Sequence, residues 1–170
     1  MPQPPLLPDV ALARVLRLAK LDGTGALVLG TIFALVAASA GHFPFAAIGL
    51  LAAGAGAVEL HGAALLRQAD PRGMNWLIAS QPFLLLVIFV YCAVRLWLVE
   101  MPPMPEQLQA LLAAGAAQWH MSIENYLRVL NRLTYSVLAV ASLFFQGGMM
   151  LYYLRRRKSV EQALAAEDHV

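Results

Sequence analysis

Charge and cysteine are both scarce in this chain. Of its 170 residues 13% are charged, against roughly 25% in an ordinary soluble domain. The 12 basic and 10 acidic residues give a net charge of +2, which is too balanced for a nucleic-acid-binding protein. The one cysteine, Cys92, excludes a disulfide within the chain and a cysteine-based zinc site.

Hydrophobic residues, by contrast, make up 60% of the chain, against a usual value of roughly 45–50%. A soluble fold of this length cannot enclose that much apolar surface and keep a wettable exterior. The composition therefore predicts an integral membrane protein. Three stretches of more than 20 residues contain no Asp, Glu, Lys or Arg: residues 23–58, 73–94 and 133–154.

The uncharged stretches set the number of membrane spans. A helix needs about 20 apolar residues to cross the hydrocarbon core, so the first stretch is too long for one span. Gly41, His42, Phe43 and Pro44 interrupt it near the middle, and proline suits the first turn of a helix. We expect an all-α fold with four transmembrane helices in an antiparallel bundle. The expected spans are residues 22–40, 44–66, 73–99 and 131–154.

The segments outside these spans are short. Residues 1–21 form an N-terminal segment in which 9–21 read as an interfacial amphipathic helix that ends at Asp22-Gly23; the alternative is simply a positively flanked span. Residues 100–130 form an outer loop, whose residues 106–118 predict a helix over the outer mouth of the bundle. Ser122 is expected to cap the helix that follows and runs into the last span. Residues 155–170 form a basic tail.

Basic residues are unequally divided between the two predicted membrane faces. The larger group is Arg14, Arg17, Lys20, Arg67, Arg72, Arg155, Arg156, Arg157 and Lys158, and the smaller is Arg95, Arg128 and Arg132. Because cytoplasmic loops carry the excess of Lys and Arg, both termini are expected in the cytoplasm. The pattern resembles that of small four-span bacterial membrane proteins, so we expect the bacterial cytoplasmic (inner) membrane.

Small residues recur at four-residue spacing in the second predicted span, at Gly49, Ala53 and Ala57 and again at Ala52 and Gly56. Small residues at this spacing let membrane helices approach closely. The stripe predicts a tight hairpin of the first two spans, and the alternative is a homodimer seam on the same face.

Glu59 is the one acidic residue well inside a predicted span. A charge at membrane depth costs roughly 2.5–3.5 kcal/mol on insertion scales, so such a residue normally faces the bundle or a wet cavity. Glu59 lies eleven residues before Asp70 and Gln81 eleven residues after it, which places both at similar depth. Thr31 and Gln146 fall near the same level, so the sequence predicts an intramembrane polar layer of Thr31, Glu59, Gln81 and Gln146.

This polar layer has two interpretations. One is a proton or cation site with Glu59 as the titrating group, and the other is a set of structural hydrogen bonds between helices. Pro82 predicts a helix kink, because it lacks an N–H and frees the carbonyl of Ile78. Arg95 is an outer-side charge that we expect to extend toward the headgroups, with Glu100, Glu106 and Glu124 as candidate partners.

No catalytic motif is recognisable in the sequence, so we expect no enzyme, no cofactor and no metal site. The first hypothesis is a structural or assembly component of a membrane complex. The alternative is a proton- or cation-linked transporter or channel subunit that uses Glu59. The expected partners are the lipid bilayer and either a second copy of the chain or another membrane protein, and no nucleic acid.

Overall fold

The computed structural model describes residues 8–97 and 106–167, and these residues fold into helices joined by short turns. Four helices are long and apolar enough to cross a membrane, and a fifth is short. They are α1 (Pro8–Ser39), α2 (Phe43–Arg67), α3 (Gly73–Trp97), the short α4 (Glu106–Gln118) and α5 (Ile123–Glu167).

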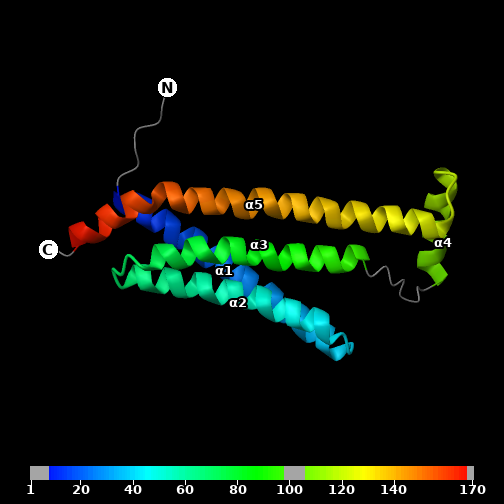
Figure 1. Cartoon of the computed structure of the whole chain (residues 1–170), viewed down its shortest axis with the longest axis horizontal. Coiled ribbons are helices and arrows are strands. Elements are labelled where there is room, and N and C mark those ends of the chain that lie inside the picture. Colours follow the sequence, from blue (N-terminus) through cyan, green and yellow to red (C-terminus); the bar gives the residue numbers. More distant parts are fainter. Residues whose placement is uncertain (1–7, 98–105, 168–170) are drawn as a thin grey trace, which may run out of the picture.

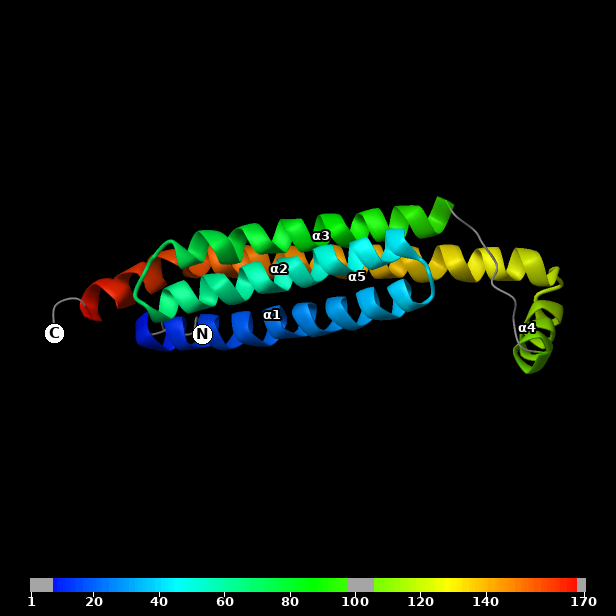
Figure 2. The same ribbon diagram turned by 90° about the horizontal axis from the view of Figure 1, so that it is seen from below.

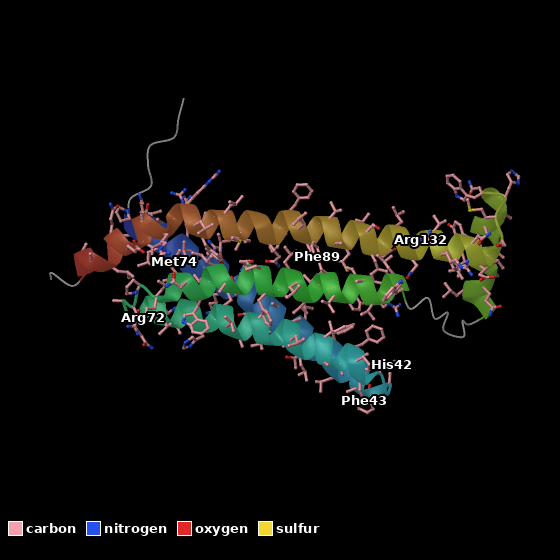
Figure 3. All side chains as sticks on the ribbon, viewed as in Figure 1. His42, Phe43, Arg72, Met74, Phe89 and Arg132 are labelled. Atoms are coloured by element: carbon pink, nitrogen blue, oxygen red, sulfur yellow. The ribbon has the colours of Figure 1, made fainter. Side chains whose placement is uncertain are left out.

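The four long helices run in alternating directions along one axis (Figures 1 and 2). We call the end that holds the start of α1, residues 68–72 and residues 155–167 the basic end, because all nine residues of the larger basic group lie in or beside these segments. The opposite end, with the α1–α2 turn and α4, is the far end. Figure 3 shows Arg72 at the basic end and His42 at the α1–α2 turn.

The start of α1 differs from the sequence-based expectation. Residues 9–21 are not a separate interfacial helix, because α1 continues through Asp22 and Gly23 without a break over its 32 residues. Their apolar side is covered by protein, with Ala11, Val15 and Ala19 fully buried. Gly23 does not end the helix. A glycine stands there because the backbone of α2 approaches α1: a Cβ at position 23 would be 3.1 Å from the Gly56 carbonyl oxygen.

Glycine allows α1 and α2 to touch backbone to backbone. A Cβ added at Gly30 would lie 2.5 Å from the Ala53 nitrogen, and one at Gly49 would lie 2.7 Å from the Ala34 nitrogen. The small-residue stripe is therefore used within the chain, as expected for the hairpin. Ala57 is exposed, whereas Gly56 from the second set of small residues is buried, and a Cβ there would lie 2.5 Å from the Gly23 carbonyl oxygen of α1.

The hydrophobic core lies toward the basic end, where α1, α2, α3 and α5 meet. Its buried residues are Val15, Ala19, Ala63, Leu66, Met74, Leu77, Tyr153, Val160 and Leu164. Val160 and Leu164 come from the part of α5 that follows the last predicted span. Residues 155–167 of the tail are thus a helical continuation of α5 that packs on the core.

At the far end α5 extends past the other three long helices, and α4 lies against its first turns (Figures 1 and 2). α4 covers the same residues as the predicted helix, and the Ser122 hydroxyl accepts a 3.3 Å hydrogen bond from the Asn125 amide, as expected of a cap. However, α4 does not cover the mouth of the bundle. It packs on α5, where Gly115 lies against the ring of Tyr126.

Candidate functional site

Glu59 lies on α2, inside the bundle, with 1% of its surface exposed. Its Oε1 atom accepts two hydrogen bonds, one at 2.8 Å from the Tyr153 hydroxyl on α5 and one at 3.1 Å from Gln81 Nε2 on α3. Both donors are themselves buried. The acidic side chain therefore connects three helices that are distant in sequence.

A second carboxyl group joins this cluster from α1. Gln81 Nε2 also lies 3.4 Å from Asp22 Oδ2 and 3.4 Å from the Ser80 hydroxyl oxygen. Each of the four long helices thus supplies one member of what we call the polar cluster: Asp22, Glu59, Gln81 and Tyr153. One amide group donates to both carboxyl groups.

The donors of the hydrogen bonds to these two carboxyl groups are neutral: the amide of Gln81 and the hydroxyl of Tyr153. Among residues 8–97 and 106–167, the salt bridges are Arg128 with Glu124 and Arg157 with Glu161, both on the surface of α5. No Lys or Arg of those segments pairs with Asp22 or Glu59. Because a buried charge is costly without a partner, the cluster favours either protonated, neutral carboxyl groups or a bound cation.

Two amide oxygens near this level have no hydrogen-bond partner within the described part of the chain. They are Oε1 of Gln81 and Oε1 of Gln146, and both are buried. Gln146 precedes Tyr153 by seven residues on α5, which places the two side chains on the same face of the helix about two turns apart. Gln146 is buried, and within the described residues no hydrogen bond joins it to the polar cluster.

Thr31 is not part of this arrangement. Its side chain is exposed, and its hydroxyl donates a 2.7 Å hydrogen bond to the Leu27 carbonyl of its own helix. The reason is helical geometry: nine residues separate Thr31 from Asp22, which at about 100° per residue puts them on opposite faces of α1. The structure therefore brings together Glu59 and Gln81 of the predicted layer, and does not bring Thr31 to them.

Pro82 lies inside α3 on an exposed face, and α3 remains helical on both sides of it. His61, two residues after Glu59, is also exposed and stacks edge-on against Trp76 at 5.5 Å between ring centroids. Neither side chain takes part in the polar cluster. In the described segments, His, Cys, Asp and Glu do not come together in groups of three that would hold a metal ion.

Sequence reasoning missed Asp22 and Tyr153. Asp22 was placed at the edge of a span, because the helix was expected to begin there. Ala11, Val15 and Ala19 recur every four residues, and this spacing was the signal that α1 starts earlier and carries Asp22 inward. Tyr153 is not among the residues of the predicted layer, although its seven-residue spacing from Gln146 places both on one face of the helix.

Among the residues that the structure describes, the side-chain partners of Arg95 are aromatic. Its Nε donates a 2.8 Å hydrogen bond to the Tyr135 hydroxyl, and its guanidinium lies 5.5 Å from the ring centroid of Phe45. Asn131 Nδ2 donates to the Arg95 carbonyl at 3.1 Å. Of the expected partners, Glu124 pairs with Arg128, and the side chains of Glu100 and Glu106 lie outside the described residues. Arg95 thus ties α3 to α2 and α5.

Comparison with known proteins gives no likeness: no family model, no curated protein and no solved structure matches the chain.

Proposed function

We propose that the chain is a structural or assembly component of a membrane complex. The observation that carries this proposal is the arm, by which we mean α4 and residues 119–130. The arm projects beyond the ends of α1, α2 and α3 at the far end (Figures 1 and 2). Within the described residues it lies outside the hydrophobic core of its own chain.

The arm is apolar as well as exposed. Leu111 is 72% exposed and Trp119 66% exposed. The other large hydrophobic side chains exposed on the arm are Leu108, Met121, Ile123 and Val129. These residues fall outside the four spans that the charge pattern predicts, the last of which begins at residue 131. Apolar surface of this kind outside a membrane marks an interaction site. A membrane protein partner at the far end supplies the cover.

The proposed setting is the bacterial cytoplasmic membrane with both termini in the cytoplasm. The clustering of nine basic residues at one end of the long helices supports this orientation, because Lys and Arg are retained on the cytoplasmic side. The arm then lies on the outer side. The bilayer covers the apolar sides of the four long helices.

Native mass spectrometry of the full chain, extracted gently from its own membrane, tests the assembly proposal. We expect a stoichiometric second polypeptide. The double variant Leu111→Ser/Trp119→Ser is expected to lose that polypeptide, while the matched variant Gln118→Ala, on the same arm, retains it. A chain that extracts only as a monomer or as copies of itself contradicts the proposal, as does a partner that the double variant still binds.

A second candidate function is favoured by the polar cluster. Asp22 and Glu59 share one amide donor inside an apolar bundle and have no basic partner within the described residues. A proton or a small cation satisfies such a pair, and intramembrane acids of this kind occur in proton relays. We propose Glu59 as the group that binds the proton or cation in a transporter or channel subunit.

Flux in liposomes tests this second candidate. The purified chain is expected to move protons or a monovalent cation with a rate that depends on pH, and Glu59→Gln is expected to abolish the flux. Glu124→Gln, an exposed acid on α5, is the matched control. Flux from the purified chain counts against a purely structural role, whereas its absence, or flux that survives Glu59→Gln, removes Glu59 from any transport mechanism.

A further inference from the structure

A groove on α5 near the basic end has the chemistry of a lipid site. It has a volume of about 490 Å³ and is lined by Gly148, Leu151, Tyr152, Arg155 and Arg156. These positions recur at spacings of three and four residues, so they lie on one face of the helix. The apolar members precede the two arginines, and the groove therefore changes from apolar to cationic along its length.

The two arginines are available to an anion. Within the described part of the chain neither forms a salt bridge, whereas Arg157 pairs with Glu161. The guanidinium of Arg156 lies 5.9 Å from the ring centroid of Tyr152, which holds it at the groove. Arginine binds phosphate oxygens through a rigid fork of N–H donors, so the cationic end of the groove fits a phosphodiester group.

The apolar end of the groove fits a hydrocarbon chain. Gly148 has no side chain, and a Cβ added there would meet nothing within 4 Å. Leu151 is 53% exposed beside it. Gly148 and Arg155 are seven residues apart, about 10 Å along the helix, which matches the passage from the acyl chains of a phospholipid to its headgroup.

We propose that this groove binds one anionic phospholipid from the leaflet at the basic end, with the phosphodiester on Arg155 and Arg156 and an acyl chain over Gly148 and Leu151. The charge of the site selects an anionic headgroup over a zwitterionic one, because basic pockets at the cytoplasmic side of membrane helices attract anionic lipids. The proposal is independent of what the arm or the polar cluster does.

Lipid retention by the purified full chain tests the proposal. The chain is delipidated in detergent, phosphatidylglycerol or phosphatidylcholine is added, and bound lipid is counted by native mass spectrometry. We expect one tightly held phosphatidylglycerol and no comparable phosphatidylcholine. Replacing both arginines, Arg155→Gln/Arg156→Gln, is expected to weaken phosphatidylglycerol binding about 30-fold.

Two further variants separate loss of the site from loss of the fold. Gly148→Leu fills the apolar end where space is free, and it is expected to weaken phosphatidylglycerol binding while the thermal unfolding temperature stays unchanged. Arg128→Gln/Arg132→Gln removes the same charge near the far end and is expected to leave lipid binding unchanged. Equal binding to the wild type and to all variants overturns the proposal, as does equal binding of the two lipids.

Inorganic phosphate distinguishes a lipid from a free anion. Phosphate at millimolar concentration is expected to leave bound phosphatidylglycerol in place, because it makes no contact with Gly148 or Leu151. If phosphate displaces the lipid completely, and if Gly148→Leu has no effect, then the site takes a free phosphate and the lipid proposal is wrong.

Discussion

The Tyr153 hydroxyl on α5 and the Glu59 carboxyl on α2 are joined by a 2.8 Å hydrogen bond across 94 residues of sequence. Tyr153 is fully buried and Glu59 is 1% exposed. Water does not compete for such a bond in the interior of the bundle, so loss of the Glu59 oxygen leaves the Tyr153 hydroxyl without an acceptor. This pair therefore fixes the position of α5 against the α1–α2 hairpin at the basic end.

Removing the Tyr153 hydroxyl tests how much this hydrogen bond contributes to the free energy of unfolding. Tyr153→Phe is expected to lower the free energy of unfolding by about 0.6–2 kcal/mol, the range found for hydrogen bonds between membrane helices. Thermal unfolding in detergent measures it. Tyr152→Phe is the matched control, because the neighbouring ring keeps its contacts with Tyr153 and Arg156. Equal losses in the two variants contradict the structural importance of the buried bond.

Two substitutions at Glu59 distinguish the effect of losing its ionisable group from the effect of losing its acceptor oxygen. Glu59→Gln keeps an acceptor oxygen for Tyr153 and Gln81, so the free energy of unfolding is expected to change by less than about 1 kcal/mol. Glu59→Leu leaves the buried Tyr153 hydroxyl without its acceptor and removes the shortest of the three contacts of Gln81 Nε2, so it is expected to cost about 1–3 kcal/mol more. Unfolding of the two variants side by side measures the difference. Equal stability of the Gln and Leu variants contradicts the role of Glu59 as a buried hydrogen-bond acceptor.

The α1–α2 contact predicts opposite outcomes for two glycines. Gly30→Ala forces a Cβ to within 2.5 Å of the Ala53 backbone and is expected to cost about 1–3 kcal/mol. Gly54→Ala places its Cβ in open space and is expected to be neutral or to stabilise the helix by up to about 1 kcal/mol. Unfolding temperatures compare the two. A harmless Gly30→Ala contradicts the backbone-to-backbone packing.

The candidate spans could be predicted because they depend on composition alone. Charged residues are costly at membrane depth. The uncharged stretches therefore mark α2, α3 and the middle of α5 within a few residues. The start of α1 could not be predicted in this way. Its basic residues Arg14, Arg17 and Lys20 indicated a surface helix. Val15 is instead buried in a core that includes Val160 from the tail of α5, and the four-residue spacing in α1 does not say which segment covers it.

The polar cluster was predictable in depth and only partly in membership. Counting residues from the α2–α3 turn placed Glu59 and Gln81 at one level, because the two helices are joined by a short turn. No such turn joins α5 to these helices, so Gln146 was assigned by its distance from a predicted membrane edge. The short α1–α2 turn does relate α1 to Glu59: Asp22 lies 17 residues before Ser39 and Glu59 lies 16 residues after Phe43, which puts the two at one level. Thr31 was assigned from the membrane edge instead of from this turn, and its side chain lies on the opposite face of α1 from Asp22.

Arg95 is expected to tolerate lysine poorly. Lysine has no Nε–H in the guanidinium plane to reach the Tyr135 hydroxyl and no flat group to lie over Phe45. Arg95→Lys is expected to lower the free energy of unfolding by about 1 kcal/mol. Arg132→Lys, an exposed arginine on α5 near the same end, is expected to change it little. Equal effects of the two substitutions contradict the aromatic anchoring of Arg95.

Cysteine labelling tests the proposed orientation in the membrane. The native Cys92 is 3% exposed, so it is expected to resist water-soluble maleimides and provides a silent background. Gln162→Cys, exposed at the basic end, is expected to react only after cells are permeabilised. Ala40→Cys and Gln118→Cys, exposed at the far end, are expected to react in intact spheroplasts. The reverse pattern places the basic end outside, and labelling of all three from one side contradicts a four-span topology.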